Sequence, residues 1–277
     1  MEFRIGRSVK PQTINQFGEV SFVSSAGVKP AAYTEDDCID YGFEYIDSTC
    51  FSVSNDTDFL VQSNTGVYNH GSGNAINPDV YNSTIIGERN YINQFSSNNI
   101  VAGDSNTINS ISNTLLNGTY GDAKYNNSQV LGGNQDDDIL GERQSILLLA
   151  GADTTNSTYT RSYLNDDGST SFNVEDNSIV AYTAHTIGVR TGGTAGGNKG
   201  DFKYWIERGA VVSRGGTLTL SRTRDTICSD GTTTGWNVNS DVDGTAFYVE
   251  VKGKNNMNLK WIVRLEISEM RTGIDLS

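Results

Sequence analysis

The first residues that could bind a metal ion or take part in catalysis are three adjacent carboxylates, Asp136 to Asp138, in the segment QDDDILGE. Carboxylate oxygens are ligands for Ca²⁺, but calcium loops place them at alternating positions around a glycine turn. Three adjacent side chains diverge instead of converging on one ion. We therefore interpret this run as a solvated turn between two repeats, and we expect no metal site.

The other candidates for catalysis are isolated residues. Neither histidine, His70 or His185, has a serine-and-carboxylate context, and no cysteine or histidine has the spacing of a zinc site. The segment RTGGTAGGNKG at 190–200 is rich in glycine and contains a lysine, but it lacks the P-loop spacing and a following helix, so we expect a flexible loop. The sequence predicts no catalytic residue, no cofactor and no enzymatic activity.

Sugar recognition is the remaining chemistry that single residues suggest. Exposed tryptophans stack on sugars, and the chain has Trp205, Trp236 and Trp261. Packing in a core or interface is favoured for Trp261, whereas Trp236 follows the turn-rich TTTG and is the candidate for surface recognition. The enzymatic alternative is a glycan-degrading fibre with paired carboxylates in a groove between repeats. The repeats carry few acids on their strands, so we prefer the non-enzymatic interpretation.

Composition limits the class of protein and its partners. The formal net charge is −13, which would repel nucleic acid and anionic membranes, so we expect neither as a partner. No apolar run reaches the length of a signal peptide or a membrane span, and SILLLAGA at 145–152 is interpreted as a short buried strand. Abundant glycine and asparagine favour turns and short strands. We expect a soluble, mostly β chain.

The three cysteines are too few for a disulfide scaffold. Cys38 and Cys50 flank a predicted aromatic hairpin in DDCIDYGFEYIDSTCFSV and could lie close together, but free thiols are the expected state. Cys228 has no evident partner.

The element that dominates the middle of the chain is a short repeat. Each copy has an asparagine five residues before a glycine, with steps of 16, 15 and 14 residues between copies: Asn82 and Gly87, Asn98 and Gly103, Asn113 and Gly118, Asn127 and Gly132. This period fits two strands of about four residues with a turn after each. We expect stacked coils, in which glycine supplies positive φ at corners and asparagine amides bond to the next coil.

Each repeat also carries two adjacent aliphatic residues: Ile85 and Ile86, Ile100 and Val101, Leu115 and Leu116, Val130 and Leu131. Neighbours on a strand point to opposite faces, so one residue of each pair fills the coil and the other faces outward. The exposed residues would be buried most simply against copies of the same chain, and we predict a homotrimer. The alternative is a monomer whose own segments cover both faces. A looser fifth copy ends at Gly151, with Leu149 in the aliphatic position.

The segments NSTIIGERNYI and NNIVAGDSNTI resemble the head repeats of trimeric autotransporter adhesins and similar repeats in phage fibres. This resemblance covers about residues 64–152 and implies a left-handed parallel β-roll. The adhesins also have a signal peptide, a heptad stalk and a membrane anchor, none of which is found here, so the phage version fits better.

The last third of the chain reads as separate strands with alternating apolar and polar residues. In LKWIVRLEISEM, one face carries Trp261, Val263, Leu265 and Ile267, as expected for an antiparallel β-sandwich with one wet face. The ending VKG followed by LKWIVRLE resembles a C-terminal knob of phage structural and tail-fibre proteins, over about residues 181–271. This resemblance implies a virion component whose knob helps trimerisation or contacts the host.

The predicted fold is therefore all-β and homotrimeric, with a β-roll shaft and a sandwich knob. The expected parts are an N-terminal arm at 1–35 that anchors to the virion or is flexible, an aromatic hairpin collar at 36–63, repeats at 64–152, a polar connector at 153–180 and the knob at 181–277. We predict a non-enzymatic fibre or decoration protein of a phage virion, assembled in the host cytoplasm. Its expected partners are itself, other virion proteins through the arm, and a host surface glycan or protein through the knob. The alternatives are a glycan-degrading tail fibre and a bacterial surface adhesin.

Overall fold

The computed structural model describes residues 9–14, 19–24, 30–41, 43–46, 48–51, 65–133, 139–272, 274 and 276. Within these ranges the chain is all-β apart from one short helix, and it includes a β-solenoid of about four turns. No helix in these ranges is both long enough and apolar enough to cross a bilayer. The run Asp136 to Asp138 lies outside the described residues.

An N-terminal module has its own small core. Its elements are β1 (Val9–Ile14), β2 (Val20–Ser24), α1 (Glu35–Asp40), β3 (Glu44–Ile46) and β4 (Thr49–Phe51). The helix begins at a capping box, in which Thr34 and Asp37 satisfy each other's backbone N–H groups. Phe22 is buried in the core beside the ring of Tyr33, whose centroid lies 4.5 Å away.

Three expectations for this module need correction. Residues 1–35, expected to form an anchoring or flexible arm, contain β1 and β2, which pair in antiparallel register. The first half of the predicted hairpin is the helix α1, since the capping box and the acidic first turn stabilise a helix there, and only β3 and β4 form a hairpin. Cys38 and Cys50 are both fully buried and form a disulfide, so the expectation of free thiols is wrong.

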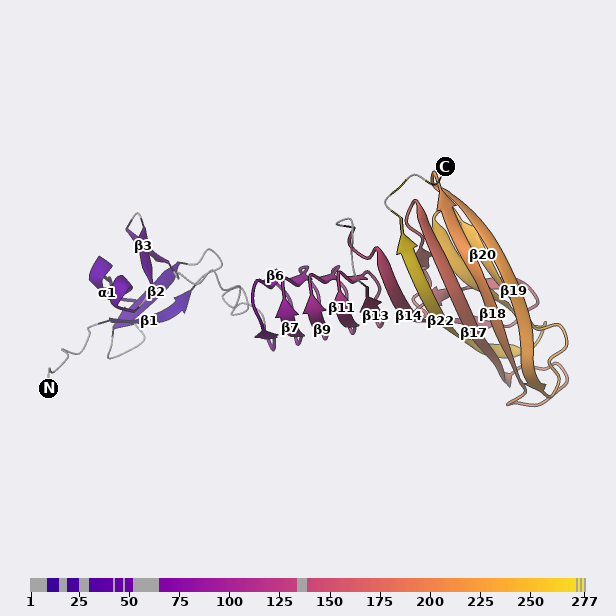
Figure 1. Cartoon of the computed structure of the whole chain (residues 1–277). Helices are drawn as coiled ribbons and strands as arrows, with labels where there is room; N and C mark the ends of the chain where they lie inside the picture. The colour runs from indigo at the N-terminus through magenta and orange to yellow at the C-terminus, as the bar shows by residue number, and fades with distance from the viewer. Residues whose placement is uncertain are drawn as a thin grey trace.

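The solenoid strands form two parallel stacks. One stack is β5 (Tyr68–His70), β7 (Thr84–Glu88), β9 (Ile100–Asp104), β11 (Leu115–Thr119) and β13 (Gln129–Gly132). The other is β6 (Ala75–Ile76), β8 (Tyr91–Ile92), β10 (Thr107–Ile108) and β12 (Asp122–Ala123). Figure 1 shows β7, β9, β11 and β13 side by side. Single parallel bridges join Tyr81, Ser97 and Ser112 on a third side of the coil.

Glycine and asparagine set the spacing of these coils. Gly103 has φ +128°, and a Cβ on it would overlap the carbonyl oxygen of Gly118 in the next coil. This position of the coil therefore tolerates no side chain. The corner residues Asn98, Asn113 and Asn127 have φ between 55° and 60°. Nδ2 of Asn98 donates to Oδ1 of Asn113 at 3.1 Å, and Asn113 donates to Asn127 at 2.9 Å. Each coil is thereby bonded to the next along one edge.

A second asparagine ladder runs inside the solenoid. Asn74, Asn90 and Asn106 are all fully buried. Nδ2 of Asn90 donates to Oδ1 of Asn74 and to the carbonyl oxygen of Gly103, both at 3.0 Å. Nδ2 of Asn106 repeats this arrangement with Asn90. The ladder fills the polar side of the coil, while aliphatic side chains such as Ile85 fill the rest.

The C-terminal module continues the same sheet in antiparallel pairing. Its elements are β14 (Arg143–Thr154), β15 (Tyr159–Leu164), β16 (Phe172–Asn173), β17 (Ser178–Gly192), β18 (Phe202–Arg214), β19 (Thr217–Asp230), β20 (Asn237–Asp243), β21 (Ala246–Lys252) and β22 (Asn258–Arg271). The path β5-β7-β9-β11-β13-β14-β22-β17-β18-β19, which we call the long sheet, runs through both modules (Figure 1). The strands β15, β16, β20 and β21, which we call the small sheet, pair around β21.

Two expectations about this region are wrong. The segment around Leu149 is not a fifth coil, because β14 runs antiparallel to β13 and pairs with β22 over twelve residues. The predicted connector at 153–180 holds β15 and β16, which pair with β21. Its sequence is polar because one face of β15 is open to solvent.

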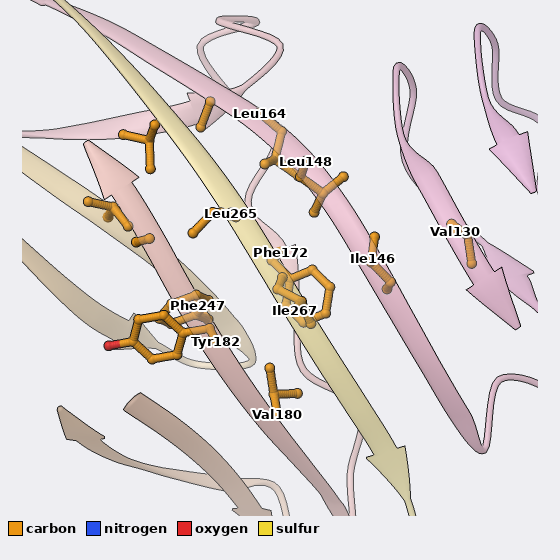
Figure 2. Packing of buried hydrophobic residues seen from close by; sticks show 14 of the residues in the cluster. Val130, Ile146, Leu148, Leu164, Phe172, Val180, Tyr182, Phe247, Leu265 and Ile267 are labelled. Atoms are coloured by element: carbon orange, nitrogen blue, oxygen red, sulfur yellow. The ribbon is translucent and has the colours of Figure 1, made fainter. Parts of the chain in front are cut away.

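One hydrophobic core joins the solenoid to the C-terminal module. Figure 2 shows Val130 of the last coil followed by Ile146 and Leu148 of β14, with Ile267 of β22 and Phe172 of β16 close by. Tyr182 of β17 and Phe247 of β21 meet with ring centroids 4.5 Å apart, so the small sheet packs against the inner face of the long sheet.

The glycine-rich loop between β17 and β18 is held by the buried side chain of Arg190. Its guanidinium donates to the carbonyl oxygens of four loop residues, Gly192, Gly193, Ala195 and Gly196. Four hydrogen bonds to one arginine fix the path of the backbone, so the expectation of a flexible loop is corrected.

Candidate functional site

The outer face of the long sheet, which is the face turned away from the cores, carries exposed large apolar side chains in both modules, with polar side chains between them on β14 and β22. The exposed large side chains on it are Tyr68, Ile86, Ile100, Leu115 and Leu131 on the solenoid and Leu149, Ile179, Ile187, Ile262 and Met270 on the C-terminal strands. Their exposed fractions lie between 38 and 59%. We call this surface the aliphatic face. A stripe of this length on one sheet face is unusual for a surface that stays in water.

Half of the side chains predicted for packing between copies are not on this face. Ile85, Val101, Leu116 and Val130 are 0 to 4% exposed and lie inside the coils. Their partners Ile86, Ile100, Leu115 and Leu131 are 42 to 57% exposed and point outward. Only the second set is available for contacts with another chain.

A polar group interrupts the aliphatic face on the C-terminal strands. Nδ1 of His185 lies 2.7 Å from the hydroxyl oxygen of Tyr204, and Nε2 lies 3.8 Å from Oε1 of Glu266. Arg264 donates to the same carboxylate at 2.5 Å. His185, Tyr204 and Arg264 border a shallow depression of about 310 Å³ that also includes Ile187. The predicted isolated histidine His185 therefore has partners, whereas His70 is exposed and stacks beside Tyr68.

The outer face of the small sheet has a different chemistry, with aromatic and hydrogen-bonding side chains. The strand register puts Tyr159, Lys252 and Asn237 in one row across β15, β21 and β20, and Arg161, Glu250 and Asn239 in the next row. Nδ2 of Asn237 donates to the hydroxyl oxygen of Tyr159 at 2.6 Å, and the ammonium of Lys252 lies 5.3 Å from the centre of the same ring. We call this surface the polar face.

Arg161 links the polar face to an open pocket at the solenoid. Its guanidinium lies 3.5 Å over the ring of Tyr248 and donates to Asp243 at 3.2 Å. The pocket has a volume of about 430 Å³ and is lined by hydroxyl, amide and charged groups: Lys124, Tyr125, Arg161, Ser169, Thr170, Ser171, Asn173, Glu175 and Ala246. Most of these groups both donate and accept hydrogen bonds.

Two residues of this pocket, Lys124 and Glu175, belong to an ionic network that joins the solenoid to the C-terminal strands. Nζ of Lys124 lies 2.5 Å from Oε1 of Glu175 and 3.2 Å from Oδ2 of Asp122. Arg271 binds Asp122 at 2.7 Å and Glu269 at 3.2 Å. Burial lowers the pKa of Arg271, but the carboxylates of Glu269 and Asp122 outweigh this and raise it overall.

Tyr125 lies between the network and the pocket. Its hydroxyl oxygen accepts a hydrogen bond from the backbone N–H of Asn173 at 2.8 Å. Burial raises the pKa of this hydroxyl far above its ordinary value, so it stays protonated at neutral pH.

The tryptophan predicted for surface recognition is not at the surface. Trp236 is 3% exposed, and its ring packs edge-on against Trp261 with centroids 6.0 Å apart. The turn before it leads directly into β20, which carries the ring into the core. Trp205 and Trp261 are also buried.

Sequence reasoning missed the side chains that the structure brings together on the polar face. Tyr159, Arg161 and Tyr163 alternate in the segment TYTRSYL, and this alternation indicates a strand with an aromatic outer face. The many threonine, asparagine and serine residues around the segment masked that signal. Among the described residues, no group of acidic, histidine or cysteine side chains is arranged to hold a metal ion.

No known protein family matches the chain, and no curated protein sequence is similar to it. Similar solved structures include the tailspike protein gp49 of the Acinetobacter baumannii bacteriophage Fri1, a capsular polysaccharide depolymerase, with 10% identity and a TM-score of 0.26 over 69% of this chain. Another is the tailspike of Acinetobacter baumannii phage AM24, with 8% identity and a TM-score of 0.25 over 76% of this chain. The chain spans 41 and 51% of these two structures, about half of their length.

The first of these structures corrects one prediction. Gp49 is a depolymerase and therefore an enzyme, which is the alternative and not the preferred interpretation of the sequence. The prediction of a non-enzymatic protein is overturned by this finding and is not kept.

Proposed function

We propose that the chain is one subunit of a homotrimeric phage tail spike or fibre that engages a polysaccharide of the host surface. The single observation that carries this proposal is that the two sheets of the C-terminal module carry different kinds of side chain on their outer faces. The long sheet presents exposed isoleucine, leucine and methionine side chains with polar ones between them, whereas the small sheet presents aromatic, amide and charged side chains. The first chemistry suits burial against protein, and the second suits a polyhydroxylated ligand.

Assembly is supported by the continuity of the aliphatic face. Isoleucine and leucine side chains recur on it from β7 to β17, in two modules that share one sheet. In a rotationally symmetric assembly the same face of every copy turns toward the axis, so a stripe along the rod is buried along its whole length. Three narrow coils side by side are the simplest such arrangement.

Glycan engagement is supported by the open pocket and the polar face beside it. Sugars present several hydroxyl groups and apolar C–H faces, so their sites combine convergent hydrogen-bonding groups with aromatic rings. The pocket supplies Thr170, Asn173 and Glu175, and the polar face supplies Tyr159. This surface belongs to the other sheet, so assembly through the aliphatic face leaves it open to solvent.

The remaining parts of the proposal follow this division. The two sheets of the C-terminal module act as a sandwich knob, and the solenoid acts as a left-handed shaft. The N-terminal module, which has its own core and a disulfide, attaches the subunit to other virion proteins.

A binding assay with a matched variant tests the proposal. Purified protein is titrated with polysaccharides extracted from the surfaces of candidate hosts, and binding is measured by calorimetry. Arg161→Gln removes the cation between pocket and polar face and should weaken binding about tenfold, whereas Arg214→Gln removes an exposed arginine outside both surfaces and should not. Failure of the wild-type protein to bind any of these polysaccharides would contradict the proposed function.

Cleavage of the polysaccharide is the second candidate function, and one observation favours it. Glycoside hydrolysis uses two carboxyl groups on either side of the scissile bond. The ammonium of Lys124 meets the carboxylate of Glu175, which lines the pocket and is 42% exposed at its side chain, and the carboxylate of Asp122, which is buried. If this pair acts in catalysis, shorter saccharides accumulate with the wild-type protein, and Glu175→Gln stops their release while binding persists. Accumulation at an unchanged rate with Glu175→Gln would exclude this pair.

A further inference from the structure

We propose that the end of the C-terminal module away from the solenoid binds acidic sugar residues through their carboxylates. This end comprises residues 152–160, 188–204, 229–237 and 251–260, where four strand connections lie together (Figure 1). We call it the basic end. The inference rests on the proposed engagement of a polysaccharide and adds the chemical class of its sugars.

The distribution of lysine is the first observation. The chain has a formal net charge of −13 and only eight lysines. Five of these lysines lie at the basic end: Lys199, Lys203, Lys252, Lys254 and Lys260. An acidic protein that gathers its ammonium groups at one end has a strongly asymmetric electrostatic field.

Most of these lysines are free to meet an external anion. Lys260 lies 3.7 Å from Asp153. The carboxylate of Asp201 is buried and is occupied by the backbone N–H groups of Asn198 and Thr232, at 2.9 and 3.0 Å. Within the described residues, the other four lysines form no ion pair with a carboxylate. Asp230, at the end of β19, is the third acid of the basic end.

The connections that carry these lysines are braced against one another. The backbone N–H of Ala195 donates to the carbonyl oxygen of Asn256 at 3.0 Å, and that of Asn256 donates to Thr155 at 3.2 Å. The backbone N–H of Ser157 donates to the side chain of Asn255 at 3.0 Å. Together with the loop held by Arg190, these bonds fix the surface before a ligand arrives, which reduces the entropic cost of binding.

Tyr159 supplies a platform for a sugar ring at the same end. Tyr159 is 38% exposed, and Lys252 and then Asn237 follow it in the same row of the sheet. A sugar that packs its C–H face on the ring would place a ring carboxylate within reach of the Lys252 ammonium and its hydroxyl groups beside the Asn237 amide. A neutral sugar could use the ring and the amide but would leave the lysines without a partner.

The electrostatic field of the whole chain would orient the subunit relative to an acidic polysaccharide. The rest of the molecule is acidic and repels a polyanion, whereas the basic end attracts it over about one Debye length, roughly 8 to 10 Å in physiological salt. A subunit that meets an acidic polysaccharide layer would therefore turn its basic end toward the layer.

Binding to defined polymers tests this inference. The full-length protein is titrated with oligogalacturonate, with its uncharged methyl ester and with inorganic polyphosphate. We expect the carboxylate polymer to bind at least about tenfold more tightly than its methyl ester, and this difference should shrink as salt is raised. Equal binding of the ester would overturn the inference, and preference for polyphosphate would assign the end to phosphate groups instead.

Charge-matched variants locate the site. The triple variant Lys199→Gln, Lys252→Gln and Lys254→Gln should bind oligogalacturonate about tenfold more weakly. The control variant Lys10→Gln, Arg214→Gln and Arg222→Gln removes the same charge elsewhere and should bind like the wild type. Equal loss in both variants would show that only net charge matters and would refute the site. Failure of the wild-type protein to bind oligogalacturonate, together with normal binding of the host polysaccharide, would refute this inference and leave the proposed function standing.

Discussion

Replacing one buried asparagine of the solenoid should destabilise it far more than replacing a half-buried one in the same coil. Asn90 is fully buried. Its side chain donates a hydrogen bond to the Gly103 carbonyl oxygen and accepts one from the backbone N–H of Asn106. Asn90→Ala removes this partner from both groups, and neither can turn to water. Each such loss costs about 1 to 3 kcal/mol, so the free energy of unfolding should fall by about 2 to 6 kcal/mol.

The matched control is Asn93→Ala, three residues further along the coil. Asn93 is half-buried, and its amide contacts with Asn77 and Asn109 are long, at 3.3 and 3.4 Å. Water can replace these contacts, so we expect a loss below about 1 kcal/mol.

Guanidinium unfolding followed by far-UV circular dichroism measures both variants, and amide hydrogen exchange in the solenoid shows where protection is lost. All three tryptophans lie in the C-terminal module, so their fluorescence reports that module separately. Equal losses for the two variants, or a loss below about 1 kcal/mol for Asn90→Ala, would refute the claim that the inner ladder holds the coils together.

Three further predictions concern other parts of the chain. Removing the disulfide with Cys38→Ser and Cys50→Ser should lower the free energy of unfolding of the N-terminal module by about 3 kcal/mol, as expected for a loop of this length. The unfolding transition followed by tryptophan fluorescence should not change, and a shift of both transitions would contradict this prediction. Backbone N–H donors hold the pKa of Asp201 below its usual range, so its ionised form stabilises the fold above the ordinary carboxyl pKa of about 4 and loses this effect as pH falls through the lowered value. The difference in melting temperature between wild type and Asp201→Asn should therefore be full at pH 7 and shrink below about pH 4; a gap that is constant with pH would count against it. Leu115→Lys should dissociate the proposed homotrimer in size-exclusion chromatography, whereas Phe95→Lys on another side of the coil should not, and the reverse result would place the interface elsewhere.

The solenoid and the long C-terminal strands can be predicted from the sequence because their periodicity is local. The glycine steps and the alternation around Trp261 lie within single segments, and each follows from backbone geometry. The end of the solenoid is different. Leu149 sits in an apparent repeat, but the direction of its strand depends on a reversal after β13 and on twelve residue pairs with β22. Pairing over such sequence distances leaves no local signal.

The candidate site was harder to predict than the fold. Tyr159, Lys252 and Asn237 are far apart in sequence, and only the register of three antiparallel strands makes them neighbours. The pocket likewise joins Lys124 of the last coil to Glu175 and Arg161 of the C-terminal module. Trp236 shows the opposite error, because a turn-rich context suggests exposure although the next strand buries the ring.

The most direct test of the account is the mass of the native protein in dilute solution, measured by sedimentation equilibrium over a wide range of concentrations. The aliphatic face requires a cover, and we predict a single species of three times the chain mass of 30.0 kDa. A folded species that stays at the mass of one chain throughout that range would contradict the account.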